Sequence, residues 1–233
     1  GEDVLAGSIV VAKGKRISPF DAGVLAATGM RRVRVFARPR VALLSSGDEI
    51  APVDEDPPFG KVRDINRHTV GALVMSSGSH VDFGGIARDT IEDITEKLSA
   101  AQGYDCILVS GGSSKGERDH MTDSLLKLGG EILFHGINIK PGKPTIFGRL
   151  FGKPIFGLPG HPVSCAMVTV RFVLPLLKRM AGEEPGPSMS PAGTLTTNVP
   201  STYGIEEYVR VRVAREGDAL LVEPVFAKSS GIA

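Results

Sequence analysis

The sequence lacks tryptophan altogether and is poor in aromatic side chains, which make up only 6% of its 233 residues. A surface for stacking nucleic-acid bases is therefore not expected. The sequence also has no excess of charge of either sign. It contains 27 lysines and arginines and 26 aspartates and glutamates, for a formal net charge of +1. This balance gives no electrostatic argument for binding DNA, RNA or an anionic membrane.

Cysteine is scarce as well. The two cysteines, Cys106 and Cys165, lie far apart in apolar surroundings, without a CxxC pair or a His/Cys cluster. We expect two buried free thiols in a reducing cytoplasm and no structural zinc site. The first residues do not resemble a signal peptide, and the most apolar stretch, 155–177, contains prolines and Arg171. We therefore expect no membrane span and a cytoplasmic location.

Glycine and proline are plentiful, at 29 and 16 residues, and they separate short apolar runs. This punctuation is typical of an α/β protein with many tight turns. From residue 40 onward, apolar runs alternate with amphipathic segments. The predicted strands are 41–44, 81–87, 106–109, 131–134, 145–148 and 154–156, and the predicted helices are 66–76, 90–101, 119–128 and 162–180. The pattern predicts a mostly parallel sheet with helices on both faces, in three layers.

The flanks of this α/β region differ from it. Residues 1–38 predict a small piece with strands at 9–12 and 31–36 and a helix that Ser18 caps and Pro19 begins. Residues 183–192 are rich in proline, serine and glycine and predict a linker. The alternating strand 208–213 and the strand 220–225 flank Gly217-Asp218, which predicts a hairpin in a small β module. Neither flank is large enough to hold a core alone.

A glycine-rich loop, Ser-Gly-Gly-Ser-Ser-Lys-Gly-Glu-Arg-Asp at 110–119, joins a predicted strand to a helix. Glycines let the backbone approach a ligand closely, and free N–H groups at a helix start favour an anion such as phosphate. The loop is neither a P-loop nor a GxGxxG motif. Glycines needed only for the turn are an equally good explanation, and a helix cap is the simpler role for Asp119.

Two further loops carry candidate anion-binding groups. Lys140 and Lys143 stand in a turn stiffened by proline and glycine, which suits either an oxyanion clamp or a charged surface turn. Residues 157–164, Gly-Leu-Pro-Gly-His-Pro-Val-Ser, lie between a strand and a helix, so that Ser164 and helix N–H groups are available to an anion. This loop is not a serine-hydrolase nucleophile elbow.

Acidic residues follow several of the predicted strands, among them Asp48, Glu49, Asp64 and Asp89. Taken alone, each of them is better explained as a helix cap or a loop charge than as a site residue, and Asp89 is the predicted N-cap of the helix at 90–101. In a parallel sheet, however, the ends of strands near 44, 87 and 109 and the loops after 134 and 156 converge on one edge. Carboxylates there can hold Mg²⁺ while lysines and N–H groups hold an oxyanion. The residues thus indicate a Mg²⁺-dependent enzyme acting on a phosphorylated or anionic small molecule.

Six motifs in order give the chain a family resemblance. They are Gly1-Glu2-Asp3-Val4, Ser46-Gly47-Asp48-Glu49-Ile50, Asp64-Ile65-Asn66-Arg67, Ser110-Gly111-Gly112 with Gly116-Glu117-Arg118-Asp119, Lys140-Pro141-Gly142-Lys143-Pro144, and Gly157-Leu158-Pro159-Gly160-His161-Pro162-Val163-Ser164. Together they resemble the molybdopterin molybdenumtransferase family, which is related to the E domain of gephyrin. The resemblance covers nearly the whole chain.

The resemblance implies insertion of molybdate into adenylylated molybdopterin, with Mg²⁺-dependent release of AMP to give the molybdenum cofactor. It implies the second half of a split N-terminal domain at 1–38, a molybdopterin-binding α/β domain at 39–182 and the truncated start of a C-terminal β-barrel domain at 188–233. It further implies a homodimer, contacts with other enzymes of molybdenum cofactor biosynthesis, and no nucleic-acid or membrane partner.

The resemblance also assigns residues to roles. It makes Asp119 the metal ligand and matches the family's catalytic residues to Asp3, Glu49, Asp89, Asp119 and Lys140. The positions matching molybdate-binding residues are Lys143, Ser164, Arg210 and Ser230. The positions matching contacts to the pterin and its phosphate are Gly111, Gly112, Ser113, Ser114, Gly116, Pro159 and Pro162.

Two other functions remain open on the same fold. One is a molybdopterin adenylyltransferase or a related nucleotide-processing enzyme, although Gly1-Glu2-Asp3 and the strand at 208–213 argue against it because those relatives lack such flanks. The other is a non-catalytic scaffold, since gephyrin's related domain also organises a receptor lattice. No feature of the sequence indicates a groove for a protein partner.

Overall fold

The structure is a computed structural model that describes residues 4–111, 120–184 and 190–225. Its centre is a six-stranded sheet in the order β4-β1-β5-β9-β8-β6. The strands are β1 (Arg40–Ser46), β4 (His80–Ala87), β5 (Cys106–Ser110), β6 (Glu131–His135), β8 (Ile146–Leu150) and β9 (Lys153–Leu158). Only β8 runs against the direction of the others in this sheet. The predicted α/β fold with a mostly parallel sheet is confirmed.

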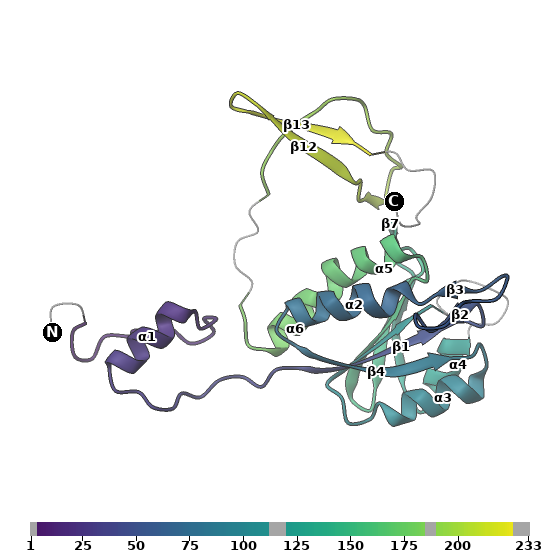
Figure 1. The fold of residues 1–233 in the computed structure, drawn as a ribbon, viewed down its shortest axis with the longest axis horizontal. Coiled ribbons are helices and arrows are strands. Elements are labelled where there is room, and N and C mark those ends of the chain that lie inside the picture. The colour runs from purple at the N-terminus through teal and green to yellow at the C-terminus, as the bar shows by residue number, and fades with distance from the viewer. Residues whose placement is uncertain (1–3, 112–119, 185–189, 226–233) are drawn as a thin grey trace.

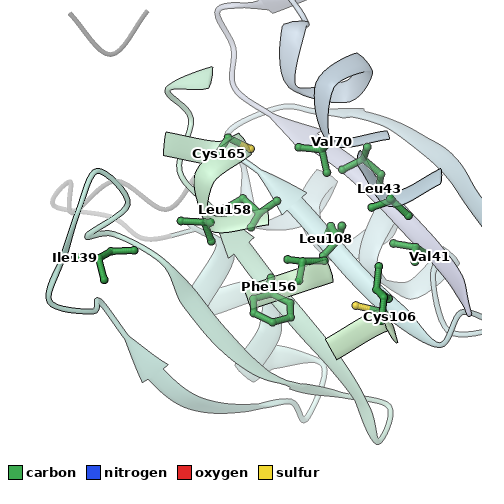
Figure 2. Close-up of a cluster of buried hydrophobic side chains, with 13 residues drawn as sticks. Val41, Leu43, Val70, Cys106, Leu108, Ile139, Phe156, Leu158 and Cys165 are labelled. Atoms are coloured by element: carbon green, nitrogen blue, oxygen red, sulfur yellow. The ribbon is translucent and has the colours of Figure 1, made fainter. Parts of the chain in front are cut away.

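Helices cover both faces of the sheet, because successive residues of the buried strands point to opposite sides. In β1, Val41 and Leu43 pack toward α2 (Ile65–Ser76), α5 (Pro162–Val168) and α6 (Leu174–Met180), in the cluster that Figure 2 shows. Ala42 and Leu44 pack toward α3 (Ile91–Ala100) and α4 (His120–Lys127) on the other face. The three layers are visible in Figure 1.

The last helix of the α/β unit is interrupted where the sequence predicts one continuous helix. Between α5 and α6 lies a π-helical turn, Thr169–Val173, just before Pro175. Proline has no N–H to donate and crowds the preceding turn, and a wider turn relieves both problems. The Thr169 hydroxyl donates a 2.8 Å hydrogen bond to the carbonyl of Cys165 at the start of this turn.

The N-terminal piece contains the predicted helix, α1 (Pro19–Ala27), which Figure 1 shows apart from the sheet. Ser18 and Asp21 form a reciprocal capping box at its start. The Lys15 ammonium contacts the Asp21 carboxylate at 2.6 Å, and its hydrogen bond is the main reason why the pKa of Asp21 falls to about 2.

The predicted strands at 9–12 and 31–36 do not form. Although 31–36 alternates like a strand, no neighbouring strand within the described residues pairs with it, and Val33 and Val35 are exposed. The Phe36 ring instead packs against Gly182, where a Cβ would lie 2.2 Å from the ring. An alternating sequence alone therefore does not make a strand without a partner.

The C-terminal piece forms a second, three-stranded sheet from β10 (Thr194–Leu195), β12 (Val211–Glu216) and β13 (Ala219–Pro224). The turn between β12 and β13 contains Gly217 and Asp218, so the predicted hairpin is confirmed. A short strand, β11 (Glu206–Glu207), pairs in parallel with β7 (Ile139–Lys140). This pairing joins the C-terminal piece to the α/β unit (Figure 1).

Across 4–111, 120–184 and 190–225, every helix is too short or too polar to cross a lipid bilayer. Cys106 and Cys165 are both buried free thiols, as predicted. Burial raises the pKa of each thiol to about 12, because the charged thiolate loses its hydration inside the core.

Candidate functional site

Three neighbouring parallel strands, β1, β5 and β9, end side by side at one edge of the sheet. In their register Ser45 lies opposite Ser110, and Ser110 lies opposite Leu158. The Ser110 hydroxyl donates to the Ser45 hydroxyl at 3.3 Å, and the Gly111 N–H donates to the Leu158 carbonyl at 3.1 Å. The predicted convergence of strand ends at this edge is therefore confirmed for β1, β5 and β9.

A cleft of about 640 Å³ opens at this edge. Its walls come from the end of β1 and the strands β2 (Ile50–Ala51) and β3 (Val62–Arg63), from the start of α2, from the end of β5, and from the turn between β9 and α5. Five residues predicted for the site line it: Glu49, Gly111, Pro159, Pro162 and Ser164. Its size and position suit a small-molecule ligand at the carboxyl edge of a parallel sheet.

Gly111 lets two strand ends approach each other at the floor of the cleft. Its φ is +90°, and a Cβ at this position would lie 2.1 Å from the carbonyl oxygen of Ser46. No side chain fits there, so the glycine serves close backbone packing as well as ligand access. Of the two explanations left open by the sequence, a glycine needed for the turn and a glycine for ligand approach, the structure supports the first at Gly111.

Glu49 folds back over its own turn toward the cleft. Gly47 has a φ of +149°, and a Cβ there would lie 2.8 Å from a carboxylate oxygen of Glu49. The glycine thus leaves room for the carboxylate of Glu49 beside the cleft it lines. The acidic turn after β1 is therefore shaped to present this carboxylate.

Asp89 is not among the described residues that line the cleft, but it is hydrogen-bonded to Ser46, which does line it. It follows β4, and its carboxylate accepts hydrogen bonds from the Ser46 hydroxyl at 2.9 Å and the Asp48 N–H at 3.4 Å. The prediction that Asp89 caps helix α3 is wrong. Thr90 is the N-cap, with its hydroxyl accepting from the Asp93 N–H at 3.3 Å. Asp89 is instead tied to the strand end next to it.

Asp64 and Asn66 tie the start of α2 to the cleft. Asp64 Oδ1 accepts from the Arg67 N–H at 3.0 Å, which confirms its predicted capping role. Asn66 Nδ2 donates to the carbonyl of Gly160 at 2.8 Å, across to the turn before α5. Asp64 Oδ2 and Asn66 Oδ1 are buried acceptors without a hydrogen-bond donor within the described part of the chain. Both residues line the cleft, and such unpaired acceptors concentrate at functional sites.

The predicted cationic residues do not line the cleft within the described part of the chain. Lys140 lies in β7, where its ammonium is 3.6 Å from the Glu207 carboxylate. Lys143 is exposed, and the next residue, Pro144, is the one from this turn that lines the cleft. Arg210 lies in the C-terminal piece, where its carbonyl accepts from the Val225 N–H.

Several predicted site residues fall outside the described ranges, and their placement stays a prediction. They are Asp3, Gly112, Ser113, Ser114, Gly116, Asp119 and Ser230.

The sequence analysis missed one charged residue of the cleft. Arg63, in β3, is the only described lining residue with a permanent positive charge. The signal for it is weak, because Arg63 sits in a two-residue strand without an apolar pattern, one position before the Asp64-Ile65-Asn66 motif.

The donor chemistry of the cleft is that of hard oxygen ligands. Carboxylates of Glu49 and Asp64 line it, Asp89 stands behind Ser46, and Ser110 ends the strand below. Within the described residues, no three or more histidine, cysteine or acidic side chains are grouped for a metal. Mg²⁺ commonly uses only one or two protein carboxylates and completes its shell with water and phosphate oxygens. The residues present fit that mode of binding.

Comparison with known proteins shows which family this chain belongs to. The family described as "Probable molybdopterin binding domain" matches residues 42–179, which run from within β1 to α6 and include all the described residues that line the cleft. The chain belongs to this molybdopterin-binding family. The predicted resemblance to the molybdopterin molybdenumtransferases is confirmed by several relatives of that name.

The molybdopterin molybdenumtransferase of Haemophilus influenzae is 35% identical over 185 residues, which is 79% of this chain and 46% of the relative. That of Bacillus subtilis is 29% identical over 234 residues, 100% of this chain and 54% of the relative. A crystal structure of a molybdopterin biosynthesis MoeA protein from Pyrococcus horikoshii matches with a TM-score of 0.80 and 35% identity, over 94% of this chain and 53% of that one. The chain thus spans about half the length of these relatives.

Proposed function

We propose that this protein inserts molybdate into adenylylated molybdopterin and releases AMP to form the molybdenum cofactor. The observation that carries the proposal is the match to a molybdopterin molybdenumtransferase along the whole chain, including both flanks of the α/β unit. The carboxylates and narrow glycine turns of the cleft suit a ligand that carries a pterin, a phosphate bridge and a metal oxyanion.

The chain's own residues would divide this task by position. The backbone at Gly111 and the rigid Pro159 and Pro162 shape the cleft for close approach of the pterin and its phosphate. The hydroxyl of Ser164, in the first turn of α5, would donate to molybdate as substrate. Lys143 and Arg210 would supply further positive charge to the oxyanion, and Ser230 would be a further molybdate-binding residue. The protein would act as a homodimer.

In the proposed mechanism, water attacks phosphorus to break the phosphate bridge, and the attacking water must give up a proton. Glu49 lines the cleft and would accept it, since Asp64, the other acidic lining residue, is engaged as the cap of α2. Asp89, oriented by Ser46, would lie beside the bridge together with Asp119 and Asp3, and Lys140 would neutralise the departing AMP phosphate. Mg²⁺, held by Asp119 with help from Asp89, would neutralise charge on the bridge when bound.

The direct test supplies purified full-length protein with adenylylated molybdopterin, molybdate and Mg²⁺. Released AMP and reconstitution of a cofactor-free molybdenum enzyme are both measured. We expect Glu49→Gln to slow AMP release by about 100-fold or more, as for loss of a general base, while the exposed surface variant Glu131→Gln behaves as wild type. Asp119→Ala is expected to abolish turnover.

Three results would change the assignment. Normal turnover by Asp119→Ala or Glu49→Gln would contradict the proposed mechanism. Transfer of AMP from ATP to molybdopterin would instead favour the adenylyltransferase. A protein that dimerises in light scattering, yet binds neither molybdate nor pterin, would favour the scaffold.

A further inference from the structure

Arg63 brings a fixed positive charge to a cleft whose other described charges are negative. Glu49 and Asp64 both line the same cleft, and Arg63 is the one described lining residue whose side chain stays positively charged at every physiological pH. Among the described lining residues, two carboxylates repel a negatively charged ligand and Arg63 supplies the one permanent positive charge that attracts it. Arg63 is therefore the first candidate among these residues for contacting an anionic group.

The backbone of Arg63 is held firmly at this place. β3 pairs in parallel with β2, with Ala51 opposite Arg63. On either side, the Val62 N–H donates to the Glu49 carbonyl at 2.8 Å and the Asp64 N–H donates to the Ala51 carbonyl at 2.9 Å. The arginine is thus anchored between the acidic turn after β1 and the cap of α2, both of which belong to the cleft wall.

The side chain of Arg63 is only lightly engaged. Its Nε donates to the Val53 carbonyl at 3.3 Å, and one terminal nitrogen contacts Asp56 Oδ1 at 2.6 Å. A guanidinium has five N–H donors, so these two contacts orient it and leave others for a ligand. Its side chain is 45% exposed, whereas that of Asp56 is fully exposed.

We propose that Arg63 binds a phosphate group of the ligand in this cleft, and that Asp56 occupies the guanidinium in the free protein and competes with that phosphate. The proposal rests on the proposed function only for the identity of the phosphate-bearing ligand. The positive charge of Arg63, its place in the cleft wall and its contact with Asp56 carry the rest.

The competition favours phosphate for a physical reason. An ion pair with a fully exposed carboxylate is weak, because water screens it and a loop side chain loses freedom in making it. A phosphate carries more charge and several acceptor oxygens, and it fits the planar fork of a guanidinium with two parallel hydrogen bonds. The ligand can therefore displace Asp56 without disturbing the backbone of β3.

Calorimetric titration of the purified full-length protein with inorganic pyrophosphate tests this directly, with AMP as a second probe and uncharged adenosine as the negative control. We expect Arg63→Gln to raise the dissociation constant for pyrophosphate by about tenfold or more, as for loss of a charged hydrogen-bonding partner. Arg63→Lys should fall between wild type and Arg63→Gln, because it keeps the charge and loses the fork.

Asp56→Asn should move the affinity in the opposite direction. Removing the competitor is expected to lower the dissociation constant by about two- to fivefold, the range of an exposed ion pair, and the difference from wild type should be largest at low ionic strength. Arg149→Gln and Glu131→Gln break a comparable exposed pair on β6 and β8 and should leave pyrophosphate binding unchanged.

Unchanged pyrophosphate affinity in Arg63→Gln, or no binding by wild type, would overturn the proposal. Weaker pyrophosphate binding by Asp56→Asn would contradict the competitor role. It would show that Asp56 helps binding by positioning the Arg63 guanidinium. Thermal unfolding of each variant separates loss of binding from loss of folding. Because pyrophosphate binding needs neither molybdate nor turnover, a protein that binds through Arg63 but makes no cofactor would refute the proposed function and leave this inference standing.

Discussion

The Cα of Gly111 faces the carbonyl oxygen of Ser46 so closely that a Cβ on Gly111 would lie 2.1 Å from it. The two residues lie at the ends of neighbouring parallel strands, and their contact forms the floor of the cleft. This close packing fixes the two strand ends relative to each other. The same contact makes this part of the site sensitive to a single methyl group.

Gly111→Ala is therefore expected to destabilise the protein by about 2–4 kcal/mol, the combined scale of a positive φ and an overpacked contact. Gly129→Ala is the matched control, because Gly129 also has a positive φ but a Cβ there meets nothing within 4 Å. It should cost about 1–2 kcal/mol. Urea unfolding measures both, and equal losses in the two variants would show that the contact with Ser46 is not tight.

The hydrogen bond from Ser46 to Asp89 predicts that the two residues act as a unit. Ser46→Ala should reduce AMP release through a lower kcat with little change in KM, because Asp89 loses its orientation while the cleft keeps its shape. The double variant with Asp89→Asn should be no slower than Asp89→Asn alone. Ser99→Ala, which removes an exposed hydroxyl on α3, serves as the control. Independent, multiplicative losses would refute the coupling.

Thiol chemistry gives a prediction about pH. A cysteine in the unfolded chain has its ordinary pKa of 9.0, whereas burial raises the pKa of Cys106 and Cys165 to about 12. The folded state thus holds these protons longer, so their contribution to stability is complete below pH 9 and is lost as the pH rises from 9 toward 12. We expect a steeper fall of the unfolding temperature between pH 8 and pH 10 in wild type than in Cys106→Ala. Parallel pH profiles for the two proteins would contradict this.

The same burial predicts inert thiols in the native protein. At pH 8 a disulfide reagent should modify neither cysteine within minutes, and should modify both at once after denaturation in guanidinium chloride, because the thiolate is the reactive form. Rapid modification of the native protein would mean that at least one thiol is accessible.

The C-terminal piece is anchored by Tyr208 as well as by the pairing of β11 with β7. Its hydroxyl donates to the Glu206 carboxylate and accepts from Arg171 Nε at 2.8 Å. Tyr208→Phe should leave the unfolding temperature of the α/β unit unchanged and speed proteolysis between residues 190 and 225. Tyr203→Phe, which alters a fully exposed tyrosine, should have no such effect. Equal protease sensitivity in both variants would contradict the anchoring role.

Much of the α/β unit follows from local sequence. Apolar runs such as 41–44 and 106–109 are buried strands because parallel strands covered on both faces need apolar side chains at every position. The helix start at Ser18 and Pro19 follows from capping. The strand predicted at 31–36 is wrong because alternation identifies a surface that can pack, and a strand also needs a neighbour.

The composition of the cleft was predictable only in part. Glu49, Gly111 and Ser164 follow strand ends, so topology alone brings them to one edge. Arg63 was missed because it enters the cleft through the pairing of two very short strands, which has no periodic signal. The surroundings of Lys140 depend on β11, which lies far along the chain in the C-terminal piece, and no local pattern predicts such a contact.

The most direct test of the account is a crystal structure of this protein with molybdopterin bound. The account predicts pterin density in the cleft at the carboxyl ends of β1, β5 and β9, against Gly111 and Pro159, with the phosphate beside Arg63. Pterin ordered on another face of the molecule, with this cleft empty of it, would contradict the account.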